Sequence, residues 1–183
     1  CIWQGGLSIY GALLGFLATS IVFLRKYGYN LWLWFDLMMP SILFGLIILQ
    51  LANFMMQFSL GTPLGLDIPN DHSLAEYVEY RYRPTGFEAY QYFQPVALYQ
   101  AFAYSIVFII SVLCLLINRK YKFLAEGTVF LFSVILMAII RFGIGFMYFS
   151  VNKDMLLYPM QWIALTVMIA TVFIYVVKRF QHN

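Results

Sequence analysis

The chain has 183 residues, of which 63% are hydrophobic and only 10% are charged, and its formal net charge is +3. A soluble domain normally carries about 25% charged residues, so this composition excludes an ordinary soluble globule. Lipid must therefore solvate most of the surface. The informative signal is a run of about 20 apolar residues, which crosses roughly 30 Å of hydrocarbon as a helix.

Five such apolar runs follow one another along the chain, without the short alternating strands of a membrane barrel. We predict an all-α polytopic transmembrane bundle, a single domain over residues 1–183 with a polar loop at 61–94 between its second and third helices. The predicted helices are Leu7–Leu24, Leu31–Phe58, Pro95–Ile117, Leu124–Phe149 and Leu157–Val177.

Basic residues orient these helices, because short loops rich in Lys and Arg stay on the cytoplasmic side. They gather at alternate helix ends, so the chain is predicted to begin outside and to end inside. We interpret this basic excess as a topology signal and expect no nucleic-acid partner. The basic residues of the predicted inner ends are Arg25, Lys26, Arg119, Lys120, Lys122, Lys178 and Arg179.

The cysteines and histidines predict neither a metal site nor a cofactor. Cys1 and Cys114 show no metal-ligand spacing, and His72 and His182 lie outside the predicted helices. Because the chain lacks an initiating Met, Cys1 is either the lipidated first residue of a processed lipoprotein or the start of a piece whose true beginning lies upstream. We favour the second explanation.

Arg141 is the clearest case of an ionisable side chain at membrane depth within a predicted helix. It lies about 25 Å along the axis from the inner end, which is outer-leaflet depth. Arg141 either snorkels toward lipid phosphates or forms a fixed cation aimed at a phosphate inside the bundle.

A polar stripe accompanies Arg141 at the same depth. Gln50, Asn53 and Gln57 share one face of the second predicted helix. Such residues either bind a ligand or join helices by hydrogen bonds, which contribute about 0.6 kcal/mol per pair in membranes. We predict a phospholipid-binding site open to the outer leaflet. Its residues are Arg141, Asn53, Gln50, Gln57, Tyr10, Gln94, Tyr99 and Gln100.

A series of short motifs runs along the whole chain in a fixed order. They are Ile2-Trp3-x-Gly5-Gly6-Leu7-Ser8-Ile9-Tyr10-Gly11, Asp36-x-x-x-Pro40-Ser41, Asn53-Phe54, Gly61-x-Pro63, Pro95-x-x-Leu98-Tyr99, Gly127 and Arg141-Phe142. This series resembles the prolipoprotein diacylglyceryl transferase family. Members of that family have seven helices, so the resemblance implies that the first two are absent from this chain. Tyr10, Asn53 and Arg141 are then the candidate catalytic residues.

The resemblance implies a bacterial inner-membrane protein. The family moves a diacylglyceryl group from phosphatidylglycerol to the thiol of a lipobox cysteine, forms a thioether and releases glycerol phosphate. The expected partners are therefore a phosphatidylglycerol-like phospholipid and lipoprotein precursors, or another membrane protein. The reaction needs a thiolate, and it needs cations to hold the phosphate as negative charge grows on the leaving group.

Several family residues are replaced in this chain. The motif Gly-Arg-x-Gly-Asn-Phe-x-Asn-x-Glu keeps only Asn53 and Phe54. The motif His-Pro-x-x-x-Tyr-Glu loses both its imidazole and its carboxylate. Tyr10 stands where many members have a His, but active branches of the family also have this substitution, so it weighs little. Gly145 stands in place of the later acid, and Tyr148 stands in place of the later arginine. The other changed positions are Leu49, Gln50, Ala52, Met56, Phe58, Gln94 and Gln100.

These losses predict weak catalysis, because deleting one preorganised donor costs about 3 kcal/mol, or about a hundredfold in rate. We expect a catalytically impaired relative that retains phospholipid or lipoprotein binding. One alternative is a working transferase in which Arg81 or Arg83 folds in from the loop to assist Arg141. The other is a structural subunit of a membrane complex that binds no ligand.

Overall fold

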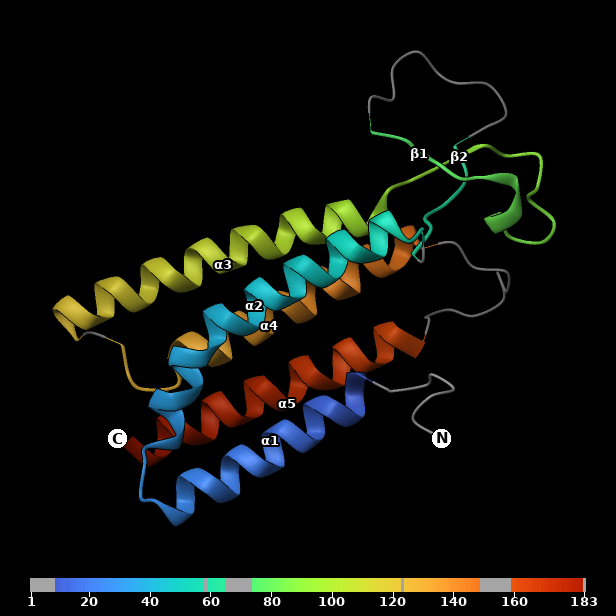
Figure 1. Cartoon of the computed structure of the whole chain (residues 1–183). Coiled ribbons are helices and arrows are strands. Elements are labelled where there is room, and N and C mark those ends of the chain that lie inside the picture. The colour runs from blue at the N-terminus through green and yellow to red at the C-terminus, as the bar shows by residue number, and fades with distance from the viewer. Residues whose placement is uncertain (1–8, 58, 65–73, 123, 149–158, 183) are drawn as a thin grey trace.

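The computed structural model describes residues 9–57, 59–64, 74–122, 124–148 and 159–182. Within these residues the chain is mainly helical, as predicted, and its five α-helices run along one common direction (Figure 1). They are α1 (Ile9–Lys26), α2 (Leu31–Met55), α3 (Val96–Tyr121), α4 (Thr128–Ile144) and α5 (Pro159–His182).

Four of these helices are long and apolar enough to cross a membrane. They are α2, α3, α5, and α4 together with the short 3-10 helix η3 (Gly145–Met147). Many large apolar side chains on their surfaces are exposed, as expected for helices solvated by lipid. The predicted fifth span and the predicted orientation of the chain ends stay predictions.

The third helix is longer than predicted. It continues through Tyr121 instead of ending at Ile117. Arg119 and Lys120 lie in its last turn, where their positive charges stabilise the negative end of the helix dipole. Basic residues therefore end the apolar run in the sequence without ending the helix. Lys122 then stops it in the left-handed conformation, with φ 50°.

The fourth helix begins later than predicted, because a side chain from α3 holds the residues before it. The Asn118 Oδ1 accepts from the Leu124 N–H at 2.8 Å, and Gly127 turns the chain with φ +80°. The buried Asp36 of α2 then caps α4. Its carboxylate accepts from the N–H groups of Gly127 at 2.6 Å and of Phe130 at 2.7 Å.

The packing of the bundle centres on four helices. α2 packs against α3, and α4 packs against both α3 and α5. The core cluster contains Met39 and Leu43 of α2 and Val107 of α3. A cation–π contact links α5 to α2, because the Lys178 ammonium lies 4.3 Å from the centroid of the Trp32 ring.

A small hairpin lies beyond the ends of α2 and α3 at one end of the bundle (Figure 1). Its strands β1 (Glu76–Tyr77) and β2 (Tyr92–Phe93) are antiparallel and are joined through the 3-10 helix η2 (Tyr80–Tyr82). Gly61 bridges to Tyr148, so the connection from α2 also contacts the residues that follow α4. This hairpin was not predicted from the sequence. We call this end of the bundle the loop end.

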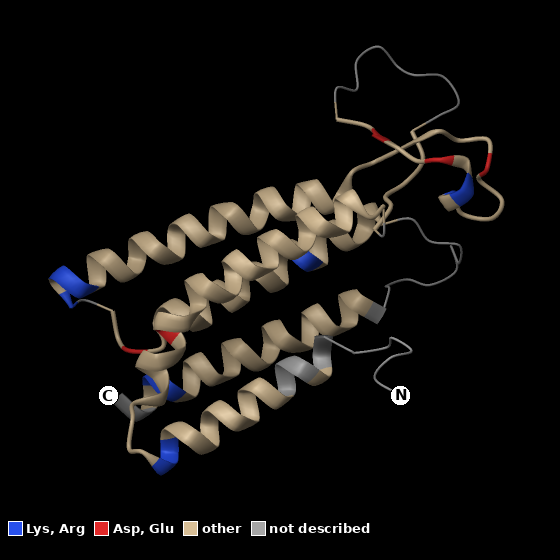
Figure 2. Cartoon of the chain, viewed as in Figure 1, with Lys and Arg blue, Asp and Glu red and all other residues tan. Residues whose placement is uncertain are grey.

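The opposite end carries basic residues and is called the basic end. Figure 2 shows Lys and Arg positions, coloured blue on the ribbon, at the ends of α1, α3 and α5 there. The acidic residues of the hairpin lie at the loop end, in the same figure. The alternate basic positions of the sequence therefore meet at one end of the bundle. They are Arg25, Lys26, Arg119, Lys120, Lys178 and Arg179.

Candidate functional site

The polar stripe of α2 divides into two parts at the loop end. Gln50 is 4% exposed, and its Oε1 accepts from Asn53 Nδ2 at 3.2 Å. Gln57 instead leaves the helix with φ 52°, so α2 ends before the predicted Phe58. The Gln57 Nε2 donates to the Tyr77 carbonyl at 2.7 Å. Gln50 and Asn53 therefore remain inside the bundle, while Gln57 fastens α2 to the hairpin.

Gln100 lies at the centre of a second polar group. It is 0% exposed, and its Nε2 donates to the Tyr104 hydroxyl at 3.1 Å. The Tyr148 hydroxyl donates to Gln100 Oε1 at 2.9 Å. Both ends of this amide are therefore satisfied, as a buried polar group requires. The three residues join α3 to the segment after α4, and we call them the Gln100 network.

Arg141 lies beside this network and is half-buried between α4 and α5. Its Nη2 lies 3.9 Å from the thioether sulfur of Met160. Burial raises the pKa of the Tyr148 phenol, and the Arg141 charge opposes that rise, which places the guanidinium near the phenol. Arg141 forms no ion pair with a carboxylate of the described residues. A weak acceptor such as sulfur leaves most of its five N–H donors unused.

Gln94 and Tyr99 have no side-chain hydrogen bond to this network within the described residues, and the third remaining predicted residue, Tyr10, cannot be placed against it. The side chain of Tyr10 lies outside the described part of the chain. The backbone N–H of Gln94 donates to the Thr62 carbonyl, and within the described residues Gln94 accepts no hydrogen bond from the Gln100 network. Tyr99 is half-buried in the first turn of α3, where its N–H bonds to the Pro95 carbonyl.

Gln161 of α5 is a member of this region that sequence reasoning missed. It is 0% exposed, and its Nε2 donates to the Phe142 carbonyl at 3.4 Å. Its side chain also packs against the backbone of Gly145, where an added Cβ would lie 2.6 Å from Gln161 Cγ. A Gln within the apolar run of the fifth predicted helix was the available signal. Tyr104 offered another, one turn after Gln100.

The chemistry of the site is that of a hydrogen-bond donor group with one cation. Guanidinium, amide and phenol groups meet at the loop end, and these groups bind phosphate oxygens well. Among the described residues, no group of three His, Cys, Asp or Glu side chains is placed to hold a metal ion. The arrangement therefore suits the binding of an anionic group.

Sequence similarity extends over nearly the whole chain. The family model for prolipoprotein diacylglyceryl transferase matches residues 1–177. The chain is 30% identical to the phosphatidylglycerol–prolipoprotein diacylglyceryl transferase of Geobacillus kaustophilus, over 97% of this chain and 63% of that protein. The corresponding protein of Shouchella clausii is 30% identical, over 96% and 61%. That of Bacillus licheniformis is 34% identical, over 73% and 46%.

The chain spans about three fifths of the length of the first two of these relatives, because the match covers 63% and 61% of their sequences. No solved structure matches the chain.

Proposed function

The chain belongs to the prolipoprotein diacylglyceryl transferase family, and from this premise we propose that its loop end binds the headgroup of a phosphatidylglycerol-like phospholipid. The observation that carries the proposal is the Arg141 guanidinium, which is half-buried and has no carboxylate partner among the described residues. A cation in this position attracts the phosphate of a lipid. Lipoprotein precursors are the proposed second ligand, by analogy with the relatives' names.

The same site supports only weak catalysis. A transferase of this kind must remove a proton from a cysteine thiol, because the thiolate is the nucleophile. The Gln100 network contains amides and phenols, which are poor proton acceptors at neutral pH. Burial raises the pKa of Tyr148 further, so its phenolate is rarer still. We therefore propose an impaired transferase that retains phospholipid binding.

This function fits a definite membrane topology. We propose that α1 is the fifth span, that the chain begins outside and ends inside, and that the protein lies in a bacterial inner membrane. The basic end then faces the cytoplasm, as the distribution of Lys and Arg indicates. The loop end and Arg141 face the outer leaflet, where lipoprotein precursors arrive after export.

The test is to measure phosphatidylglycerol binding to the purified full chain by native mass spectrometry. Arg141→Gln should weaken binding about tenfold, because a charge-assisted hydrogen bond contributes about 1.5–3 kcal/mol. Arg119→Gln at the basic end is the matched control and should leave this binding unchanged. Equal binding by the wild type and Arg141→Gln would refute the proposal and would favour a structural subunit.

A working transferase is the second candidate, and Glu76 is the observation that favours it. This carboxyl is buried at the loop end, and burial raises its pKa from 4.5 to about 7, a value that suits a general base. Arg83, one of the two loop arginines expected to assist Arg141, bonds within the hairpin. Its Nε donates to the Val78 carbonyl at 2.9 Å and its Nη1 to the Glu88 carbonyl at 2.7 Å.

Complementation separates the two candidates. A strain depleted of its own transferase should survive on this chain only if the chain forms the lipoprotein thioether. Survival that is lost in the Glu76→Gln variant would establish the second candidate. No thioether above background, together with retained phosphatidylglycerol binding, would establish the impaired transferase.

A further inference from the structure

An apolar groove opens at the basic end, away from Arg141 and the Gln100 network. Its volume is about 430 Å³, within the range of about 300–1,000 Å³ that ligand pockets occupy. α4 forms its floor, Cys114 of α3 contributes to one wall and Tyr175 of α5 to the other. The remaining lining residues are Leu124, Thr128, Val129, Phe132 and Ile135.

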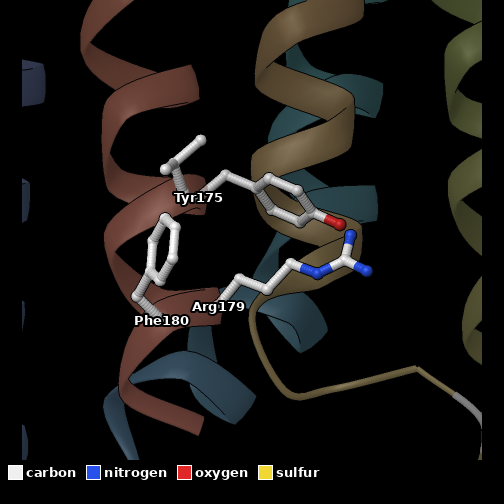
Figure 3. Close-up of a pocket in the computed structure, with 4 residues that line it drawn as sticks. Tyr175, Arg179 and Phe180 are labelled. Carbon is white, nitrogen blue, oxygen red and sulfur yellow. The ribbon is translucent and has the colours of Figure 1, made fainter. Parts of the chain in front are cut away.

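A second, smaller hollow of about 320 Å³ shares Tyr175 with this groove. It is lined by Tyr175, Val176, Arg179 and Phe180 of α5. Figure 3 shows Tyr175 and Arg179 one turn apart on α5, both reaching toward α4, with the phenol oxygen beside the guanidinium group. Tyr175 therefore connects the apolar groove with a surface hollow that contains a cation, Arg179.

We propose that this groove binds an anionic phospholipid from the leaflet that adjoins the basic end, with its phosphate at Arg179 and an acyl chain between α3 and α5. An apolar groove with a cation one helical turn beyond Tyr175 matches the two parts of such a lipid. Tyr175 lines both cavities, and its ring and hydroxyl suit the boundary between acyl chain and headgroup. The site is separate from the headgroup site proposed at the loop end.

Charge complementarity favours a lipid over a second copy of the chain. A second copy would have to bring a carboxylate to Arg179. The described acids at the same end are already engaged, because Asp36 caps α4 and Glu126 accepts from the Asn30 amide. Anionic lipid supplies the missing negative charge without such a rearrangement.

Cys114 provides the probe, because it is half-buried and lines the groove. The full chain with Cys1→Ser leaves Cys114 as the single thiol and is placed in vesicles of phosphatidylcholine, alone or mixed with phosphatidic acid. The rate of labelling by a lipid-soluble maleimide is then measured. Phosphatidic acid should slow the labelling about fivefold, the change expected for one arginine near an anionic lipid.

Three variants test the role of the cation. Arg179→Gln should abolish the slowing, and Arg179→Lys should retain it because the charge is kept. Arg119→Gln changes an exposed basic residue at the same end that does not line the groove, so it should behave as the wild type. Equal rates in both kinds of vesicle would overturn the proposal. A thiol that is protected in both, with a dimer after cross-linking, would assign the groove to a second copy and overturn it too.

Discussion

Glu76 makes the hairpin at the loop end sensitive to pH. Its side chain is 5% exposed, and neither carboxylate oxygen has a hydrogen-bond partner among the described residues. An ionised carboxylate in such surroundings loses its hydration without compensation. Burial therefore raises the pKa of Glu76 from 4.5 to about 7, and the folded hairpin holds the proton at mildly acidic pH.

The direction of the effect follows from proton linkage. Below about pH 4.5 the carboxyl is protonated whether the hairpin is folded or unfolded, so pH has no effect there. Between about pH 4.5 and 7 only the unfolded hairpin releases the proton, and the folded hairpin loses stability as the pH rises. The difference between the two pKa values corresponds to a loss of about 3 kcal/mol in the free energy of unfolding of the hairpin, and this loss is complete above about pH 7.

Hydrogen exchange of the hairpin amides measures this loss. The N–H of Val78 bonds to the Gln91 carbonyl at 3.0 Å, and its protection should fall sharply between about pH 5 and about pH 8, after correction for the intrinsic rate. Glu76→Gln keeps the shape of the side chain without its charge and should remove the dependence. Glu79→Gln, which changes an exposed acid three residues away, should keep it. Equal protection of the wild type at both pH values would refute this reasoning.

Two further predictions concern stability, measured as the thermal midpoint of the purified chain. Gly61→Ala places a Cβ 2.5 Å from Val96 Cγ2 and 2.6 Å from the Gln94 carbonyl oxygen, and this crowding should lower the free energy of unfolding by about 1–3 kcal/mol. Gly45→Ala is the control, because its added Cβ meets nothing within 4 Å. Asp36→Ala removes the two acceptors that cap α4 and should cost about 1–3 kcal/mol, whereas the exposed Ser41→Ala should be neutral.

The helices were predictable because their apolar runs are governed by the thickness of the membrane. The helix ends were less predictable, because distant side chains fix them. Asn118 holds the residues before α4, and Asp36 caps α4 from 91 residues away in the sequence. Nothing in a local apolar pattern contains these contacts. The end of α3 was misplaced for a local reason. The basic residues after Ile117 end the apolar run, but their charges stabilise the last turn of the helix and so belong to it.

The candidate site shows a similar division. Helical spacing placed Gln50 and Asn53 on one face, and the structure joins them by a hydrogen bond. Gln57 has the same spacing but turns to the hairpin, because α2 ends before it. Tyr148 could not be placed from periodicity, since it follows η3 in extended backbone, and only the fold brings its hydroxyl to Gln100.

The residue at Gly145, where the family has an acid, is best considered together with Gln161, whose side chain lies against it. The resemblance places an acid at Gly145, yet the Gln161 side chain fills the space beside that glycine, with Nε2 2.9 Å from where a Cβ would lie. Gln161 is fully buried and bonds to the Phe142 carbonyl, so it cannot move aside without leaving a buried polar group unpaired. We therefore expect positions 145 and 161 to be coupled, because an acid restored at Gly145 alone would meet the Gln161 side chain.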